Sequence, residues 1–417
     1  MEKMSEVVPG ADARNLQQFL THSKWDHREV MDQVAHDVCE ELGTRKPCGL
    51  IIDESSFEKQ GKHSVGVARQ WLGRFGKVDN GQVGVFGVLA SEKRVAAIDA
   101  RLYLPEKWCD DADRCEEAGV PQEEQLFRTK IELALEIVEH ARKQGVRFDW
   151  VGADAGYGKG LVFIDALHEL GETFMVDIHS DFSVYEENPA PYLPRKSGRG
   201  RAPIRYKSKV QSKKAVDYVA SLAPSSWNRI QVRNTTRGPM HLEVAVKSVF
   251  VWETNKESAH EYLLVASRSL DQQELKISLS NAEKSTPRKK LAFMQRQRFW
   301  VERTFEDGKS ECGMSDYQCR KWAAWHHHMA LVMMTMLFML KERALQKDSR
   351  PLLSAADIEE LLAKFLPRRD VSSEDIIRNL NERHRRRQNA IDSHTKSTRR
   401  KIRKIKRKPR SQKQSGK

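Results

Sequence analysis

Two apolar segments that each end in an aspartate constrain the fold most. Gly49-Leu-Ile-Ile-Asp53 and Phe148-Asp-Trp-Val-Gly-Ala-Asp154 are runs of the kind found in buried strands. The segments Val83 to Leu89 and Val95 to Leu104 lie between them and predict two more strands of an antiparallel meander. An amphipathic helix is predicted from Gln125 to Arg142. Because strands and helices follow one another in this way, we expect an α/β fold with a mixed sheet flanked by helices.

The pattern along the chain predicts six regions. They are a helical N-terminal segment at 1–47, the first part of a core at 48–181, a β-rich insertion at 182–288, the second part of the core at 289–345, C-terminal helices at 346–392 and a basic disordered tail at 393–417. The apolar run Met329 to Leu340 has twelve residues. A bilayer requires roughly 20, so this run predicts a buried core helix and not a membrane span.

Positive charge is concentrated at the end of the chain. The 417 residues include 72 Lys and Arg against 58 Asp and Glu, which gives a net charge of +14. Residues 396–417 hold twelve of these basic side chains and no acid, so only +2 remains for the rest. This excess suggests a polyanionic partner. We expect the tail to bind DNA phosphates without reading sequence, and the alternative is a disordered end that only aids solubility.

The spacing of the cysteines and the composition of residues 1–14 indicate in which cell compartment the protein is expected. The six cysteines form no Cys-x-x-Cys pair, which argues against a zinc ribbon or a disulfide framework. Residues 1–14 are polar and mixed in charge, unlike a secretory signal. We therefore expect a protein of the reducing cytoplasm with no membrane attachment.

Acids at strand ends are candidate metal ligands. Asp53 and Asp154 each close an apolar strand, and strand ends of one sheet can bring their side chains together. Magnesium prefers hard oxygen ligands, and two such ions can activate water and stabilise the leaving oxygen of a phosphodiester. A single aspartate after a strand is more often a turn or capping residue. By chemistry alone, Glu54 and Asp177 are equally good candidates.

A third acid is predicted on a helix with two cations. Arg298, Glu302 and Lys309 are spaced four and seven residues apart, which places them on one helical face. A metal-binding acid there would be flanked by cations suited to phosphate. Glu306 lies one turn further on and is the rival, but only Glu302 has both spacings.

This Arg-x3-Glu-x6-Lys stretch resembles the Tyr-x2-Arg-x3-Glu-x6-Lys signature of bacterial insertion-sequence transposases in the IS-four-like superfamily, with Gln295 in place of Tyr. Four further blocks are similar to the IS-seven-oh-one branch: Val65-Gly-Val-Ala-Arg-Gln-Trp71, Gln82-Val-Gly-Val-Phe86, Arg101-Leu-Tyr-Leu-Pro-Glu106 and Trp150-Val-Gly-Ala-Asp154. The resemblance covers roughly residues 11–341. It implies a ribonuclease H-like core and a DDE transposase that cleaves and joins DNA at the ends of an insertion sequence.

The resemblance also implies the site. Asp53, Asp154 and Glu302 map to the catalytic acids and hold two Mg²⁺ ions, for which Mn²⁺ can substitute, while Arg298 and Lys309 map to phosphate contacts. The implied partners are double-stranded DNA, namely terminal inverted repeats and target DNA, and a second copy of the chain in a homodimer. The implied location is the bacterial cytoplasm, in association with the nucleoid.

The insertion and a histidine run add secondary candidates. Arg195, Arg199 and Arg201 with Trp227 predict a DNA contact, since cations hold phosphates and aromatic rings stack on bases. Trp227 is preferred to Trp252, which lies in an apolar strand. A solvated basic loop with structural tryptophans is the alternative. His326, His327 and His328 are not expected to share a metal, because neighbouring helical side chains point about 100° apart.

Two other functions are compatible with these patterns. Relatives of this branch usually carry a longer helical segment before the Leu-Gln-Gln-Phe19 region, where only about fifteen residues stand here. The shorter segment and the missing Tyr suggest impaired activity, or a transposase-derived DNA-binding regulator. A general ribonuclease H-like nuclease is the other alternative, although such enzymes need neither the helix signature nor the insertion.

Overall fold

The computed structural model describes the whole chain except residues 1, 44–46, 196–200, 202, 236–237 and 408–417. The chain divides into two compact units. One unit combines Met1–Phe19 with Phe365–Lys417, and the other is Leu20–Lys364. Sequence analysis predicted separate segments at 1–47 and 346–392. This division instead places the two ends of the chain in one unit, and it assigns residues 20–47 to the unit that contains the core.

The core begins with an antiparallel meander, as predicted. Strand β1 (Gly49–Glu58) pairs with β3 (Lys77–Ser91), and β3 pairs with β4 (Arg94–Leu102). The structure adds β2 (Ala68–Leu72), which pairs with the first residues of β3, Lys77 to Gly81. Sequence analysis missed β2 because its residues alternate between partly buried and exposed and contain little apolar sequence.

Two parallel strands follow the meander. β5 (Trp150–Ala153) pairs with β1, and β6 (Phe174–Asp177) pairs with β5. Helix α6 (Lys130–Lys143) leads into β5, and α7 (Val162–Glu169) connects β5 to β6. The order β4-β3-β1-β5-β6, with three antiparallel strands followed by two parallel ones, confirms the predicted ribonuclease H-like mixed sheet.

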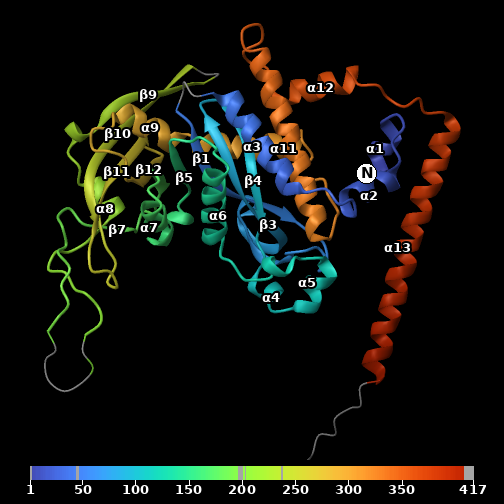
Figure 1. Ribbon diagram of the computed structural model, residues 1–417, viewed down its shortest axis with the longest axis horizontal. Helices are drawn as coiled ribbons and strands as arrows, with labels where there is room; N and C mark the ends of the chain where they lie inside the picture. Colours follow the sequence, from blue (N-terminus) through green and yellow to red (C-terminus); the bar gives the residue numbers. More distant parts are fainter. Residues whose placement is uncertain (1, 44–46, 196–200, 202, 236–237, 408–417) are drawn as a thin grey trace, which may run out of the picture. The chain divides into compact units, whose positions relative to one another are not determined.

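The predicted β-rich insertion extends this same sheet. Within the described residues, ten strands form one sheet in the order β2-β3-β1-β5-β6-β12-β11-β10-β9, with β4 beside β3 (Figure 1). The added strands are β9 (Asn228–Thr235), β10 (Gly238–Val251), β11 (His260–Ser269) and β12 (Leu275–Ser280). The strand β12, which sequence analysis missed, pairs with β6 and joins the two parts. The insertion is therefore β-rich as predicted but is not a separate sheet.

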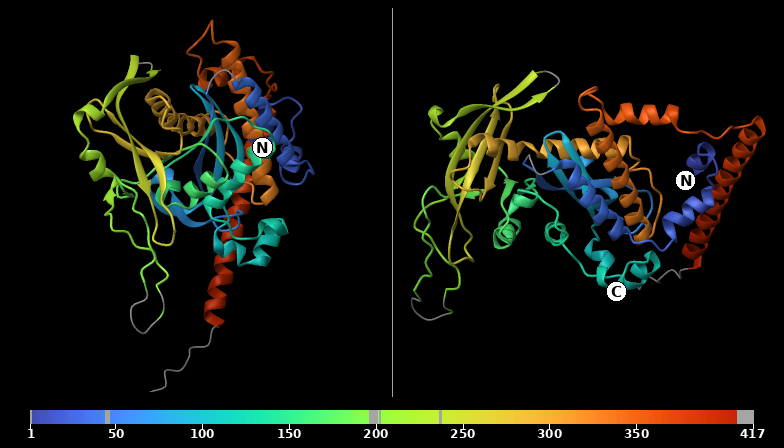
Figure 2. Two further views of the ribbon diagram at one scale, coloured as in Figure 1. Left: turned by 60° about the vertical axis from the view of Figure 1, so that its left-hand side comes forward. Right: turned by 45° about the horizontal axis from the view of Figure 1, so that its top comes forward.

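Smaller elements complete this part of the chain. Strands β7 (Ser183–Val184) and β8 (Lys213–Lys214) form a second, two-stranded sheet next to helix α8 (Ala215–Ala220). Helices α4 (Glu106–Cys109) and α5 (Ala112–Ala118) follow β4. The β9–β10 hairpin lies at the end of the large sheet away from β2, which both views of Figure 2 also show.

Three helices make up the region predicted at 289–345 as the second part of the core. They are α9 (Arg288–Arg296), α10 (Arg298–Ser310) and α11 (Trp322–Leu345). The gap between α10 and α11 contains Gly313, whose φ of +67° is a conformation that favours glycine and ends a helix.

Side chains on β3 show which helices cover which face of the sheet. Phe86 contacts Phe305 of α10 and Trp325 of α11, at ring-centre distances of 5.3 and 6.5 Å. The next residue, Gly87, faces the other way, and a Cβ there would lie 2.6 Å from Ile137 of α6. Because neighbouring strand residues point to opposite faces, α6 covers one face and α10 with α11 covers the other.

Helix α9 lies on the same face as α10. Its Leu291, Ala292 and Met294 form a buried cluster with Trp150 and Met175 of the sheet, together with Leu242, Val244, Leu263 and Val265. This cluster spans the parallel strands and the added strands. Burial of this apolar surface, at about 25 cal/mol per Å², therefore stabilises the joint between the core and the insertion.

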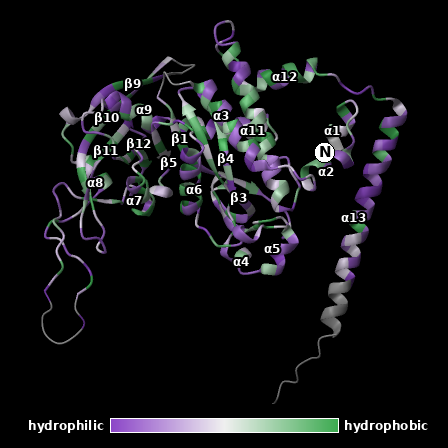
Figure 3. Cartoon of the chain, viewed as in Figure 1, coloured by the Kyte–Doolittle hydropathy of each residue, from purple (hydrophilic) through white to green (hydrophobic). Residues whose placement is uncertain are grey.

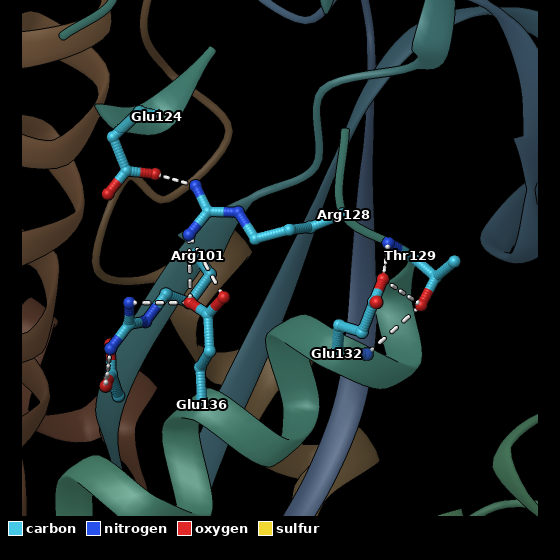
Figure 4. A network of polar contacts seen from close by, with 7 residues as sticks. Arg101, Glu124, Arg128, Thr129, Glu132 and Glu136 are labelled. Carbon is cyan, nitrogen blue, oxygen red and sulfur yellow. Dashed lines mark hydrogen bonds and ion pairs between the residues drawn. The ribbon is translucent and has the colours of Figure 1, made fainter. Parts of the chain in front are cut away.

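A polar network holds the start of α6 against β4. Arg128 pairs with Glu124 and Glu136, and Glu136 also accepts a hydrogen bond from Arg101 at 3.1 Å (Figure 4). Thr129 and Glu132 form a capping box at the first turn. The network fixes where α6 begins and so determines the position of its first residue, Lys130, which pairs with Glu54 of β1.

Helices form the chain before β1. Helix α2 (Ala13–Thr21) is followed by α3 (His27–Leu42), which begins after Asp26, whose Oδ1 accepts a hydrogen bond from the Arg28 amide. Helix α3 packs against α11 and β4. By length and composition α11 could cross a membrane, but 67% of its most apolar window is buried inside the protein, as in a core helix.

The other unit is built around one long helix. Helix α13 (Ser373–Arg407) pairs with α1 (Glu2–Val7) through Arg383 and Glu6, and the described side chains of α13 are mostly hydrophilic (Figure 3). The short helix α12 (Ala355–Phe365), which lies in the predicted region of C-terminal helices at 346–392, belongs to the large unit up to Lys364. Residues 393–407 were predicted to be disordered, but they continue α13, since Arg and Lys, which are frequent there, have high helix propensity.

Candidate active site

Three aspartates lie side by side at one edge of the sheet. In the parallel pairing, Ile52 stands opposite Ala153 and Ala153 stands opposite Val176. Each is followed by an aspartate, so Asp53, Asp154 and Asp177 occupy the same level on three neighbouring strands. Neighbouring strands are about 4.8 Å apart, which keeps such side chains close.

The three aspartates face the helices α9 and α10. Asp53 stands directly opposite Phe86 in the β1–β3 pairing, and Phe86 packs against α10. Asp154 and Asp177 share this face because residues at matching positions of parallel strands point the same way. Glu302 and Arg298 come from α10 on that face, so the predicted acids approach one region from β1, β5 and α10.

Arg298 is the cation that joins these acids. Its Nη1 lies 3.2 Å from Asp53 Oδ2 and its Nη2 lies 3.0 Å from Glu302 Oε1. Its Nε lies 3.6 Å from Asp177 Oδ2. The helix begins at Arg298, which places the guanidinium above the sheet edge. Arg298 was predicted to bind phosphate, and here its partners are carboxylates.

Burial and like charges act on these groups. Burial, together with the charge of Asp154, raises the pKa of Asp53 to about 7, although Arg298 opposes the rise. Burial also raises the pKa of Asp177, against the effects of Lys276 and Ser278. Burial would lower the pKa of Arg298, but Asp53 and Asp177 outweigh it and raise this pKa. The site therefore concentrates carboxylates whose ionised form requires nearby positive charge.

The rival acids have other partners. Glu54, the next residue after Asp53, points to the opposite face and pairs with Lys130 of α6 at 2.5 Å. Glu306 pairs with Arg303 at 3.1 Å, and 67% of its side chain is exposed. Neither contacts Arg298. The contacts therefore favour Asp53 over Glu54 and Glu302 over Glu306.

A buried tyrosine was not anticipated by sequence analysis. Tyr157 is 3% exposed, and its hydroxyl has no hydrogen-bond partner among the described residues. Burial, with the charges of Glu54, Asp53 and Asp154, raises its pKa well above the usual value. The turn that holds it is tight, because a Cβ at Gly158 would lie 2.0 Å from the Asp177 carbonyl oxygen. The only signal in the sequence was the small-residue context Asp154-Ala-Gly-Tyr-Gly158.

Lys309 and Gln295 lie away from the carboxylates. Lys309 Nζ donates to the Ser56 carbonyl at 3.4 Å and sits over the Phe57 ring. Gln295, at the signature's Tyr position, is 2% exposed and hydrogen-bonds with Ser267, Val265 and Ser278. Gln295 is thus part of the packing between α9, β11 and β12 and does not face the sheet edge.

The residues of the insertion that were predicted to contact DNA differ in burial and in their neighbours. Trp227 is partly buried, and the Arg268 guanidinium lies 4.0 Å from its ring centre. Arg195 and Arg201 are exposed, and Arg199 lies outside the described residues. Trp252 donates its indole N–H to the Lys256 carbonyl at 2.8 Å.

A cleft of about 600 Å³ opens where the parallel strands end. Its lining includes Lys159, His179 and Trp252. Lys159 follows Asp154 by five residues in the sequence, and His179 follows Asp177 by two. The lining of the cleft offers a cation, an imidazole and an aromatic ring, but it does not include the site carboxylates themselves.

The donor set has the chemistry of a magnesium site. Carboxylate oxygens from Asp53, Asp154 and Glu302 are the hard ligands that Mg²⁺ takes in proteins. Within the described part of the chain, however, no three His, Cys, Asp or Glu residues are already arranged around one point as ligands. Arg298 supplies the positive charge there instead. The residues therefore fit Mg²⁺ by type, provided that Arg298 moves away.

The histidine run packs between helices. His327 approaches the Leu20 and Trp25 carbonyl oxygens with its two ring nitrogens, at 2.8 and 2.9 Å. His326 bonds to the Trp322 carbonyl, and His328 to the Gly313 carbonyl. Each residue of the run thus has its own separate partners.

Comparison with known proteins identifies similar sequences. The family described as DDE superfamily endonuclease matches residues 1–239. A probable transposase for insertion sequence element IS701 from Microchaete diplosiphon is 30% identical over 187 residues, which is 44% of this chain. The match covers 45% of that relative, so the chain spans less than half of its length. A structure of the piggyBac transposase synaptic complex with hairpin DNA aligns over 84% of this chain and 59% of that one, at 12% identity and a TM-score of 0.37.

Proposed function

Since the chain belongs to the DDE superfamily endonucleases, we propose that it is a transposase that cuts and rejoins DNA at the ends of a bacterial insertion sequence. The relative named as a probable insertion-sequence transposase supports this choice among endonucleases. We further propose that it acts in the cytoplasm as a homodimer on double-stranded DNA, since two element ends must be held together.

One observation carries the proposal. Asp53 and Asp154 stand at the same level on neighbouring strands, and Glu302 reaches the same guanidinium as Asp53. Three acids from separate parts of the sequence thus approach one region. A structural ion pair requires only one of them, whereas a metal-dependent phosphodiesterase site requires several carboxylates.

Each residue has a part in the proposed reaction. Asp53, Asp154 and Glu302 would hold two Mg²⁺ ions, or Mn²⁺ in their place. The bound metal would supply a Lewis acid that activates water and stabilises the leaving oxygen. Arg298 would bind a DNA phosphate once released from the carboxylates, because a guanidinium matches phosphate as well as carboxylate. Asp53 must lose its proton before it can act as a ligand.

DNA would extend from the acids over basic and aromatic side chains. The cleft lined by Lys159 and Trp252, which starts five residues after Asp154 in the sequence, would take part of this DNA. We propose that Arg195, Arg199, Arg201 and Trp227 contact DNA further out, and that Lys309 supports the phosphate near Arg298. Cations would bind phosphates and the rings would stack on bases.

Cleavage of a defined duplex tests the proposal. The substrate carries the inverted repeats read from DNA that flanks the coding sequence, and the reaction contains Mg²⁺, Mn²⁺ or EDTA. We expect strand cleavage with either metal and none with EDTA. The Asp53→Asn and Asp154→Asn variants should lose cleavage and keep DNA binding, whereas Asp165→Asn on α7 should behave like the parent.

The same assay separates the alternatives. Repeat-specific binding without cleavage by the parent protein would indicate a DNA-binding regulator and contradict the enzymatic proposal. Cleavage that ignores the repeats and yields no joined products would indicate a general nuclease.

A further inference from the structure

Asp177 has the position of a functional acid but no role in the proposed triad. Asp177 is the last residue of β6. By strand register it lies level with Asp154, which follows β5, and with Asp53 in the middle of β1. Asp154 therefore has an aspartate on each side. Asp177 and Asp53 have the same side-chain exposure of 14%, whereas Glu302 is 58% exposed.

The surroundings of Asp177 orient its carboxylate. Ser278 Oγ on β12 donates to Asp177 Oδ1 at 2.5 Å, and Gln295 Nε2 donates to the same Ser278 oxygen at 2.8 Å. Oδ2 lies 3.6 Å from Arg298 Nε and 3.9 Å from Lys276 Nζ. A fixed carboxylate with one oxygen turned toward the shared guanidinium is suited to bind a cation at that point.

Positive charge is scarce in this region. The carboxylates of Asp53, Asp177 and Glu302 share Arg298, and Lys276 is the other cation near Asp177. Burying a carboxylate is costly unless it is paired and hydrogen-bonded. A region in which several acids share one guanidinium therefore favours an additional cation.

An independent observation points to a missing ligand. The Tyr157 hydroxyl is buried without a partner among the described residues, and the acids Glu54, Asp53 and Asp154 are the charges that act on it. Buried polar groups nearly always have a hydrogen-bond partner, so an unpaired one requires an explanation. Asp154 is one of these acids, so water bound to a cation that Asp154 holds would be a candidate partner for this hydroxyl.

We propose that Asp177 is a fourth carboxylate of the metal site and holds a divalent cation together with Asp154. This inference rests on the proposed function, because it adds a ligand to the same site. Arg298 pairs with Asp177, Asp53 and Glu302. A cation held by Asp177 and Asp154 would take over the charge that Arg298 supplies to Asp177.

Binding of Mn²⁺ to the full chain tests this role without any cleavage. Electron paramagnetic resonance counts free Mn²⁺ during a titration of the parent, Asp177→Asn, Ser278→Ala and Asp53→Asn proteins. We expect Asp177→Asn to weaken Mn²⁺ binding about 100-fold and Ser278→Ala about tenfold. The matched control is Asp165→Asn, whose carboxylate is 12% exposed and lies 3.5 Å from Lys256. It should bind Mn²⁺ like the parent.

The outcomes separate this inference from the proposed function. Unchanged Mn²⁺ affinity in Asp177→Asn with weakened affinity in Asp53→Asn would overturn the role of Asp177 and leave the transposase proposal intact. Weaker DNA binding by Asp177→Asn at unchanged Mn²⁺ affinity would also overturn it, since Asp177 would then only position Arg298. A parent protein that neither binds Mn²⁺ nor cleaves DNA would contradict both. If circular dichroism shows that Asp177→Asn does not fold, the Mn²⁺ affinity of Ser278→Ala is the test, because this variant keeps the Asp177 carboxylate. Unchanged affinity in Ser278→Ala would then overturn the role of Asp177.

Discussion

At the scale of single residues, the direction of one side chain decides which acid can act. Asp53 and Glu54 are neighbours in the sequence, yet a strand turns them to opposite faces. Asp53 forms an ion pair with Arg298, and Glu54 forms one with Lys130 at the start of α6. On the helix, Glu302 and Glu306 are one turn apart, and only Glu302 contacts Arg298.

We predict that Glu302→Gln abolishes metal-dependent cleavage and leaves DNA binding nearly intact, whereas Glu306→Gln retains cleavage. The amide removes a charged metal ligand without changing the shape of the side chain, and a loss of at least about 100-fold in rate is expected. Cleavage rates and electrophoretic binding of the two variants measure this. An equal loss in both would mean that Glu302 has no special role.

A second residue-scale prediction concerns Gln295, where the family signature has Tyr. Gln295→Leu should lower the free energy of unfolding by about 1–3 kcal/mol, because the Ser267 and Ser278 hydroxyls lose a buried partner. Gln295→Tyr should also destabilise the protein, since the site is 2% exposed and has no room for a ring. Denaturant unfolding of both variants checks this. A Gln295→Tyr protein that is as stable as the parent and binds DNA more tightly would contradict it.

At the scale of elements, the end of α13 and the residues after it hold most of the net charge. Residues 396–417 carry twelve of the basic side chains and no acid. This part belongs to the smaller unit of the chain. Its contribution is therefore expected in DNA binding and not in folding.

We predict that deleting residues 396–417 leaves the unfolding transition unchanged and weakens DNA binding equally for element-end and random duplexes. Each phosphate contact contributes about 0.9 to the slope of log affinity against log salt, so the slope should flatten by several units. Binding measured from low to moderate salt tests this. The same slope after truncation would mean that the segment only aids solubility and would leave Arg195 and Arg201 as the main predicted contacts.

At the scale of the whole molecule, buried histidines make stability depend on pH. Burial and the charge of Arg28 lower the pKa of His27 to about 4, and burial lowers that of His328 to about 4. An unfolded histidine has a pKa near 6.5, so the unfolded state binds more protons between these values. The histidine contribution to stability is full above about pH 6.5 and is lost as the pH falls toward 4.

We predict that His328→Gln reduces this loss by at most about 3 kcal/mol, because the amide does not titrate. Asp53, with its pKa raised to about 7, acts in the opposite sense, so the comparison is between variant and parent at each pH. Thermal unfolding from pH 7.5 to 4.5 without metal measures it. Parallel curves for the two proteins would show that His328 makes no such contribution.

The sequence by itself determined the strands β1, β3, β4 and β5, the helix α6, and the short list of acids. Apolar periodicity and the residues that end strands are local properties, so they can be read from the chain. The resemblance to insertion-sequence transposases narrowed the list to Asp53, Asp154 and Glu302, and the contacts of Arg298 agree with this choice for Asp53 and Glu302.

Only the tertiary structure decided the pairing of distant elements. β12 joins the insertion to the core sheet through β6, and its short polar-apolar sequence gave no sign of that partner. The shared level of Asp177 with Asp154 follows from strand register, and the burial of Gln295 and Tyr157 follows from packing. Register and packing depend on residues more than a hundred positions apart, and a local pattern does not contain that information.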